Sequence, residues 1–323
     1  MQIKKHTQHK AFTMLELLFV IVIMGILAKF GVAFIAKAYE SFIFSKINND
    51  LQSKSASAVE FIAKRLEYRI KPSTISRNLT TGDVNYLNDT GLSDPDATVL
   101  EWISTDSDGF RGTTAPLWSG IIDLNSSNAT RLISPATNLA SLNNLVTTLS
   151  YKNNADINDT AIYFINSYIT QNPWGYDGNI TEVNGTLTVS HIAMDGITTP
   201  TNIIDQNQTL HPIQSASNSN ELWPKFSNFS GTEVYEYYKL AWTANAVRLK
   251  DYNETTHIGD LYFYYDYRPW NGETFKDAKK VLLAKGINTF RFRSAGSLMK
   301  IQVCAKSELT DEEYALCKEK TVY

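Results

Sequence analysis

A single acidic side chain, Glu16, lies near the start of a long apolar run and poses the first chemical question of the sequence. From Phe12 to Ala36 the only charged residues are Glu16 and Lys29. An ionised carboxylate at membrane depth costs about 2.5 to 3.5 kcal/mol on insertion scales, and a paired cation makes such a charge tolerable. Glu16 therefore either reaches the lipid headgroups from an ordinary anchor or needs a cationic partner.

The two cysteines of the chain, Cys304 and Cys317, are the next reactive pair. In an exported domain such thiols can be oxidised to a disulfide. The bond would close a loop of about 14 residues, which is worth about 3 kcal/mol in the chain-entropy model. The alternative is two unrelated buried thiols. A metal site is not expected, because two cysteines without nearby histidines lack the ligands of a zinc centre.

Asparagine sequons form a third chemical pattern. Ten Asn-x-Ser/Thr triplets occur, and in six of them an acid stands two residues before the Asn. These six are Asn125, Asn158, Asn179, Asn184, Asn207 and Asn253. The extended pattern resembles the acceptor of bacterial N-glycosylation systems, and glycans need exposed loops outside the cytoplasm. The alternative is that Asn, Asp and Thr gather in the same turns.

The other reactive side chains form no catalytic or metal-binding motif. No HExxH, GxSxG, P-loop or GxGxxG pattern occurs around the five histidines or elsewhere. Asp106 and Asp108 precede Gly109 but lack the third ligand and the distal Glu of a calcium loop, so a turn is expected there. We therefore predict no enzyme, no catalytic residue, no cofactor and no metal.

The elements that would position Glu16 are a basic leader and an apolar helix. Residues 1–11 carry Lys4, Lys5 and Lys10 and no acid. A basic stretch before an apolar segment holds the N-terminus on the cytoplasmic side. Residues 12–36 would span roughly 37 Å as a helix, enough for a bilayer core of about 30 Å. With no small-x-small cleavage site after it, we expect a retained anchor and an exported remainder.

The stretch AFTMLELLFVIVIMGILA resembles the N-terminus of type IV pilins and pseudopilins. A basic leader ends in a small residue, Ala11, where Gly is usual; Phe12 follows, and Glu16 falls at the fifth mature position. The resemblance implies cleavage between Ala11 and Phe12 by a prepilin peptidase, and N-methylation at Phe12. It also implies that Glu16 pairs with the terminal amine of a neighbouring subunit, because a buried charge needs a partner.

The same resemblance implies the partners and the location. The expected function is a minor pilin or pseudopilin that primes or caps a type IV pilus, a type II secretion pseudopilus or a DNA-uptake filament. Its partners would be other minor and major subunits, the prepilin peptidase, the assembly platform and lipid of the bacterial inner membrane. Nucleic acid is not indicated, since the net charge is −3 and no basic run follows the leader. A pilus-tip adhesin and a membrane-anchored periplasmic enzyme remain as alternatives.

An amphipathic pattern over residues 37–71 continues the apolar run. Apolar residues recur at steps of three, four or seven positions at Phe44, Ile47, Leu51, Ala58, Ile62, Leu66 and Ile70. This is a helical period, and Pro72 disfavours helical geometry at the residue before it. The pattern predicts one helix from about Thr13 to Ile70, with a membrane half over residues 12–36 and an amphipathic half over 37–71.

The remaining chain predicts β-structure, so the expected fold class is α+β, a long N-terminal helix packed on an antiparallel sheet domain. Residues 72–235 are rich in Asn and Thr, with short apolar runs between turns. Residues 236–323 contain alternating strands around Gly296 that predict a hairpin. This tail resembles J-type pseudopilins of type II secretion and PilW-type minor pilins.

Thr310 and Glu313 form a capping-box pattern, so a short helix carrying Cys317 is expected to be pinned by the disulfide. Most aromatic side chains, including Trp174 and Trp270, are expected in the core, and exposed anchors for a binding partner are the alternative for these two.

Overall fold

The computed structural model of the protein has two compact units, residues 1–50 and residues 51–323. We call them the N-terminal unit and the C-terminal unit. The structure describes residues 13–82, 84–87, 98–166, 174, 177–183, 186–192, 210–225, 228–230, 233–307 and 314–323. For residues 177–183 and 186–192 it describes the backbone alone.

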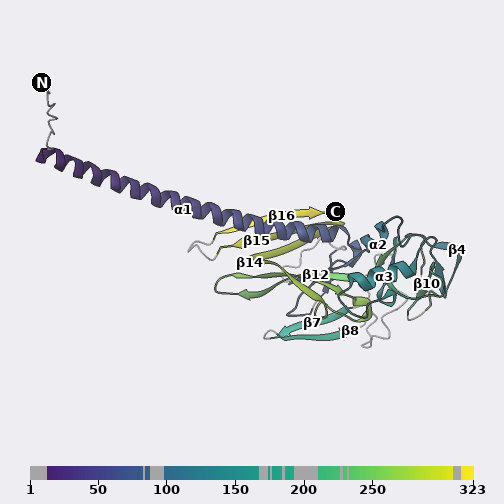
Figure 1. Ribbon diagram of the computed structural model, residues 1–323. Helices are drawn as coiled ribbons and strands as arrows, with labels where there is room; N and C mark the ends of the chain where they lie inside the picture. Colours follow the sequence, from purple (N-terminus) through teal and green to yellow (C-terminus); the bar gives the residue numbers. More distant parts are fainter. Residues whose placement is uncertain are drawn as a thin grey trace, which may run out of the picture. The chain divides into compact units, whose positions relative to one another are not determined.

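Helix α1 (Met14–Glu67) forms the described part of the N-terminal unit and continues into the C-terminal unit (Figure 1). Every side chain from Met14 to Lys46 is exposed. The first part is long and apolar enough to cross a membrane, and none of that span is buried within the chain. A helix with apolar side chains on all sides needs lipid or other apolar helices around it.

The last part of α1 has the amphipathic face that the sequence predicts. Its buried apolar side chains within the C-terminal unit are Leu51, Ala58, Val59, Ile62, Ala63 and Leu66. Phe61 packs edge-on against Phe263 of the sheet, with ring centroids 5.1 Å apart. Phe44 is 52% exposed and does not belong to this buried set. The helix ends at Glu67, and Pro72 lies in a 3₁₀ turn, η1 (Lys71–Ser73), so the predicted helix is confirmed to within three residues.

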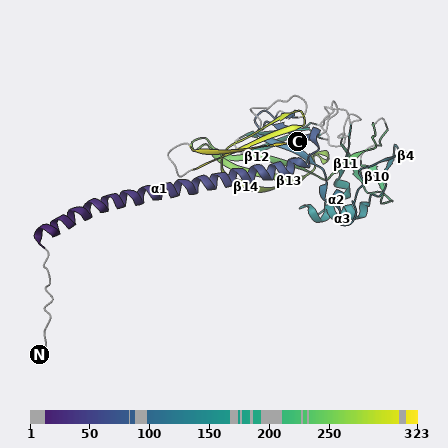
Figure 2. The same cartoon turned by 90° about the horizontal axis from the view of Figure 1, so that it is seen from above.

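The larger sheet has eight described strands in the order β16-β15-β14-β13-β12-β3-β1-β2, and all its pairs are antiparallel (Figures 1 and 2). The strands are β1 (Ile75–Arg77), β2 (Val84–Tyr86), β3 (Val99–Ser104), β12 (Thr243–Asn253), β13 (Ile258–Tyr267), β14 (Lys279–Ala295), β15 (Leu298–Lys306) and β16 (Ala315–Val322). One long helix with an antiparallel sheet domain is an α+β arrangement, as predicted.

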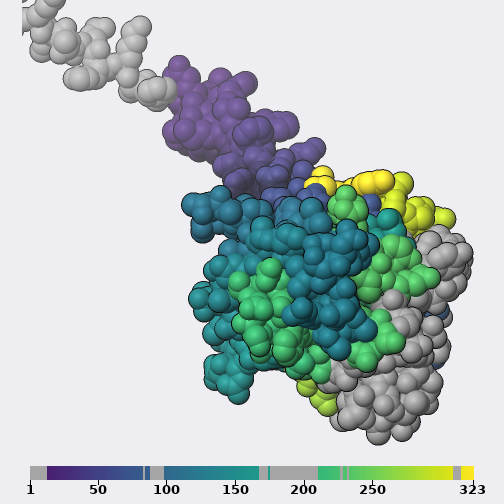
Figure 3. All heavy atoms as spheres, turned by 90° about the vertical axis from the view of Figure 1, so that its right-hand side faces the viewer, coloured from purple at the N-terminus to yellow at the C-terminus, as the bar shows by residue number. Residues whose placement is uncertain are grey.

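The second sheet has six described strands in the order β11-β6-β9-β10-β5-β4, also antiparallel. They are β4 (Asp123–Asn128), β5 (Arg131–Ile133), β6 (Ala161–Phe164), β9 (Leu210–Gln214), β10 (Glu221–Pro224) and β11 (Tyr238–Ala241). Figure 3 shows the teal segment around β4 to β6 beside the green segment around β9 to β11. This sheet therefore joins parts of the chain that are distant in sequence.

Short helices and a hairpin complete the C-terminal unit. They are α2 (Ser107–Arg111), α3 (Leu139–Leu149), the 3₁₀ turns η2 (Ile157–Asp159) and η4 (Pro269–Asn271), and a separate hairpin of β7 (Asp177–Val183) with β8 (Thr186–Ile192). On α3, Leu139 and Leu142 enter one apolar core with residues of the six-stranded sheet. Trp174 and Trp270 lie in a separate apolar core, which confirms their predicted burial.

The C-terminal strands confirm one prediction and correct another. Strands β14 and β15 form the predicted hairpin, with a positive φ of 59° at Gly296. Cys304 on β15 and Cys317 on β16 form a disulfide. However, Cys317 lies in strand β16, directly paired with Cys304, so the predicted short helix carrying Cys317 is wrong. The disulfide joins two neighbouring strands instead.

The predicted boundary at 235/236 does not coincide with a division between the sheets. Strands β1 to β3, from the predicted 72–235 region, join the same sheet as β12 to β16. Strand β11, from the predicted 236–323 region, joins the six-stranded sheet. The two regions therefore exchange strands and fold together as the C-terminal unit.

Candidate functional site

The start of α1 is built by a reciprocal cap between Thr13 and Glu16. The backbone N–H of Glu16 donates to Thr13 Oγ1 at 3.3 Å, and the backbone N–H of Thr13 donates to Glu16 Oε2 at 3.0 Å. The Thr13 hydroxyl also donates to Glu16 Oε2 at 3.1 Å. This is the capping box, which satisfies two donors that the first helical turn leaves without partners.

The capping box gives Glu16 a local role that sequence reasoning missed. The Thr-x-x-Glu spacing before an apolar run is its signal, and it stands in the sequence as Thr13-Met14-Leu15-Glu16. Gln can replace Glu in a capping box, whereas a charge pair needs the carboxylate. The two roles of Glu16 can therefore be separated by one substitution. Ala11 and Phe12, the predicted processing residues, lie outside the described residues.

The six candidate glycosylation sites divide by accessibility. Asn125 on β4 and Asn253 at the end of β12 are exposed. Asn158 is half-buried; its side-chain N–H donates to Asp156 Oδ2 at 2.9 Å, and its Oδ1 accepts from the Ser215 N–H. For Asn179 on β7 only the backbone is described, and Asn184 and Asn207 lie outside the described residues. Asn125 and Asn253 are therefore the described candidates that present a side chain to solvent.

The acid before each Asn has a structural role at two of these positions. Asp123 Oδ1 accepts from the Asn125 N–H at 3.1 Å, and Asp156 Oδ1 accepts from the Asn158 N–H at 2.8 Å. A carboxylate that accepts from the backbone two residues later forms an Asx turn. Turn formation therefore explains part of the Asp-x-Asn enrichment without glycosylation.

Asp106, the first residue of the Asp106-x-Asp108-Gly109 motif, caps a helix. Its Oδ1 accepts from the Gly109 N–H at 3.0 Å at the start of α2, as in the predicted turn. The indole N–H of Trp118 donates to Oδ2 at 3.1 Å, and that of Trp242 donates to Oδ1. Burial raises the pKa of Asp106, and these three donors oppose the rise. The carboxylate is thus held by donors on both oxygens.

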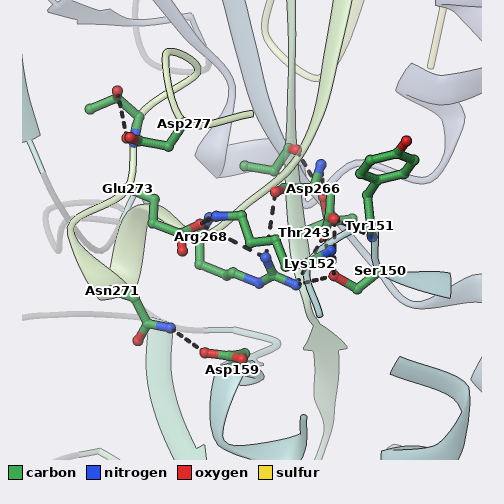
Figure 4. Close-up of polar contacts among 12 residues, drawn as sticks. Ser150, Tyr151, Lys152, Asp159, Thr243, Asp266, Arg268, Asn271, Glu273 and Asp277 are labelled. Atoms are coloured by element: carbon green, nitrogen blue, oxygen red, sulfur yellow. Dashed lines mark hydrogen bonds and ion pairs between the residues drawn. The ribbon is translucent and has the colours of Figure 1, made fainter. Parts of the chain in front are cut away.

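A buried polar cluster joins the end of α3 to the end of β13 (Figure 4). Asp266 accepts the Ser150 hydroxyl at 2.9 Å, the Tyr151 N–H at 2.5 Å and a guanidinium N–H of Arg268 at 2.9 Å. The side chains of Asp266 and Arg268 are 2% and 1% exposed. Asp266 also has a positive φ of 66°.

The geometry of this cluster fits a structural role. A nucleophilic serine needs a base that is free to take its proton. The base beside Ser150 would be Asp266, but both of its oxygens already accept hydrogen bonds, and Arg268 binds it as an ion pair. Around the cluster, Lys152 pairs with Glu273 at 2.6 Å, and Asn271 donates to Asp159 (Figure 4). We infer that the cluster fixes the segment after α3 against the end of β13.

His211 gives the C-terminal unit a pH-dependent stability. It is buried between the rings of Phe164 and Phe229, and burial lowers its pKa to about 4. The unfolded chain takes up this proton below about pH 6.5. The contribution of the neutral imidazole to the free energy of unfolding is therefore fully present above pH 6.5. About 3 kcal/mol of this contribution is lost as the pH falls towards 4.

We expect the difference in unfolding free energy between wild type and His211→Leu to change by about 3 kcal/mol between pH 7 and pH 4. Urea unfolding of the full chain in detergent micelles, followed by tryptophan fluorescence at each pH, measures this difference. Since other groups titrate equally in both proteins, their contributions cancel. A difference that stays constant over this range would contradict the account of His211.

Comparisons with protein-family models, with curated proteins and with solved structures find no match to this chain. The function is therefore argued from the residues and their geometry alone.

Proposed function

We propose that this chain is a minor subunit of a type IV pilin-like filament, where it primes assembly or caps the tip. The observation that carries the proposal is the start of α1. An exposed apolar helix, long enough to cross a membrane, bears one carboxylate in its first turn. The basic leader, Ala11, Phe12 and Glu16 around this start resemble the pilin processing signal.

In this proposal, Glu16 pairs with a cation that becomes available only during assembly. Cleavage after Ala11 releases the amine of Phe12, and methylation of this amine retains its positive charge. In a filament, the amine of one subunit meets the Glu16 carboxylate of its neighbour in an apolar environment. Such a pair is stable only in the correct register, because a displaced subunit leaves two charges unpaired. The two charges therefore act as a register device for docking.

The C-terminal unit supports a minor rather than a major role. It comprises residues 51–323, with two large sheets, and a domain of this size is difficult to repeat along a densely packed fibre. We propose that it lies outside the inner membrane at or near the filament tip. The disulfide between Cys304 and Cys317 suits such an oxidising compartment. Within this compartment, we propose Asn125 and Asn253 as the accessible glycan acceptors.

Cross-linking from α1 tests whether the helix meets other subunits. A photo-activatable amino acid at Leu17, which is 56% exposed, should capture the N-terminal helices of other filament subunits in cells that assemble the filament. Mass spectrometry of the adducts identifies the partners. The same amino acid at Tyr151, an exposed position of the C-terminal unit, serves as the control. If Leu17 captures lipid but no protein, the chain is an ordinary anchor and the proposal fails.

A further inference from the structure

A concave apolar pocket in the C-terminal unit has no role in the proposed assembly. It has a volume of about 540 Å³, within the range of small-molecule sites. Residues that follow α1, β3 and β6 line it, together with residues of α2, of the loop before β4 and of the start of β11. Its exposed large apolar side chains are 37% to 53% exposed; they are Tyr68, Phe110, Ile121, Ile165 and Tyr237.

The wall of the pocket is a continuous set of aromatic rings. The centroids of Phe110 and Trp118 are 4.8 Å apart, and those of Trp118 and Tyr238 are 5.6 Å apart. Trp118 and Tyr238 are buried, and their polar atoms are bonded within the protein: the Trp118 indole to Asp106, and the Tyr238 hydroxyl to Ser134. Trp118 and Tyr238 therefore form a fixed, buried support behind the half-exposed ring of Phe110.

The charge of the pocket is positive. No Asp or Glu lines it, and its two cations are Lys239 and Arg111. Arg111 already pairs with Asp108 at 2.8 Å on the surface. Lys239 is half-buried, and among the described residues no carboxylate lies within ion-pair distance of it. Burial lowers the pKa of Lys239, and the nearby cations Lys71 and Arg69 lower it further.

A second polar group at the pocket also lacks a partner. The Thr105 hydroxyl lines the pocket, its oxygen is buried, and it has no hydrogen-bond partner among the described residues. A buried polar group without a partner costs about 1 to 3 kcal/mol. Because the Thr105 oxygen is buried, a ligand in the pocket meets the Lys239 ammonium and not this hydroxyl. The pocket thus combines an apolar lining with one cationic donor.

We propose that this pocket binds a small molecule with an aromatic or compact aliphatic body and one carboxylate. The apolar body packs on the exposed rings of Tyr68, Phe110 and Tyr237, and the carboxylate accepts from the Lys239 ammonium. Charge-assisted bonds of this kind are about twice as strong as neutral ones. The site does not depend on the filament role, since the binding residues belong to the C-terminal unit and Glu16 does not.

The probe is 2-naphthoate, with the uncharged 2-naphthamide as a matched ligand of the same shape. Equilibrium dialysis against the full chain in lipid nanodiscs, with empty nanodiscs as the baseline, measures both affinities. We expect saturable 1:1 binding of 2-naphthoate, and binding of 2-naphthamide that is about tenfold weaker. Absence of saturable binding above the baseline, or equal affinity for the two ligands, would overturn the proposal.

Variants locate the binding site. Lys239→Gln should weaken 2-naphthoate binding about tenfold and leave 2-naphthamide unchanged. Lys285→Gln makes the same change at an exposed lysine of β14 outside the pocket and should leave the affinities for both ligands unchanged. Phe110→Ala removes a half-exposed ring that lines the pocket and should weaken the binding of both ligands. If Lys239→Gln does not fold, the Phe110→Ala result decides: unchanged affinities would place the ligand elsewhere and reject the pocket.

Discussion

Glu16→Gln is expected to leave membrane insertion intact and to reduce incorporation into filaments by about a hundredfold or more. Gln preserves the cap on Thr13, because its side-chain carbonyl can accept the same backbone N–H. It removes the negative charge, however, and leaves the terminal amine of the neighbouring subunit unpaired in an apolar environment. Breaking a buried pair in this way costs about 3 to 5 kcal/mol. The measurement compares the protein in sheared filaments with the protein in the membrane fraction.

Two controls separate the charge of Glu16 from its capping role. Thr13→Ala breaks the capping box but keeps the carboxylate, so incorporation should remain near the wild-type level. Glu40→Gln makes the same chemical change at another exposed position of α1 and should have no effect. If Glu16→Gln were incorporated normally while Thr13→Ala was not, capping would be the function of the pair, and the register device would be ruled out.

Asp266→Ala is expected to lower the unfolding free energy by about 3 to 5 kcal/mol. The substitution leaves the Arg268 guanidinium buried, with Glu273 as its remaining carboxylate at 3.9 Å. It also removes the acceptor for the Ser150 hydroxyl and the Tyr151 N–H at the end of α3. Urea unfolding of the full chain in detergent micelles measures the loss.

The protein contains a matched exposed pair that serves as the control. Arg111 and Asp108 are 2.8 Å apart, but their side chains are 78% and 53% exposed. Water and salt screen such a pair, so Asp108→Ala should cost less than about 1 kcal/mol. The double variant Asp266→Ala/Arg268→Met should recover part of the loss, because no unpaired charge remains. Equal losses for Asp266→Ala and Asp108→Ala would show that the buried cluster has no special structural role.

The parts of the fold that the sequence predicts correctly are those set by local patterns. The 3.6-residue period of Leu51, Ala58, Ile62 and Leu66 predicts the buried face of α1. The alternation of apolar and polar residues predicts the hairpin of β14 and β15, in which Phe292 and Ile301 are buried opposite each other. In each case, the pattern is formed by residues that are close together in the sequence.

Features that depend on distant pairing could not be predicted in this way. The segment from Ala315 to Val322 follows a capping-box pattern, yet it forms a strand because β15 offers it a complete pairing edge and the disulfide joins the two. Its Lys318 and Lys320 suit an exposed edge strand, since charged side chains discourage pairing with other chains. Similarly, the pocket joins residues from Tyr68 to Lys239, and no local pattern relates them.

The candidate assembly site was predictable in its chemistry but not in its geometry. The spacing of Phe12 and Glu16 was recognisable in the sequence, and α1 begins as expected. The reciprocal cap of Thr13 and Glu16 does not follow from the apolar run, because an acid in such a run is first interpreted as a charge in lipid. The proposed register device would use the same carboxylate oxygen atoms as the capping box, but in the assembled state of the subunit, which is why Gln at position 16 separates the two roles.

The intact mass and N-terminal sequence of the protein isolated from filament-forming cells test the central claim most directly. The account predicts a chain that begins at Phe12 with a methylated amine, with additional mass only if glycans occupy sites such as Asn125 or Asn253. A protein that is incorporated into filaments while it still begins at Met1, with the lysines of its leader attached, would contradict the account.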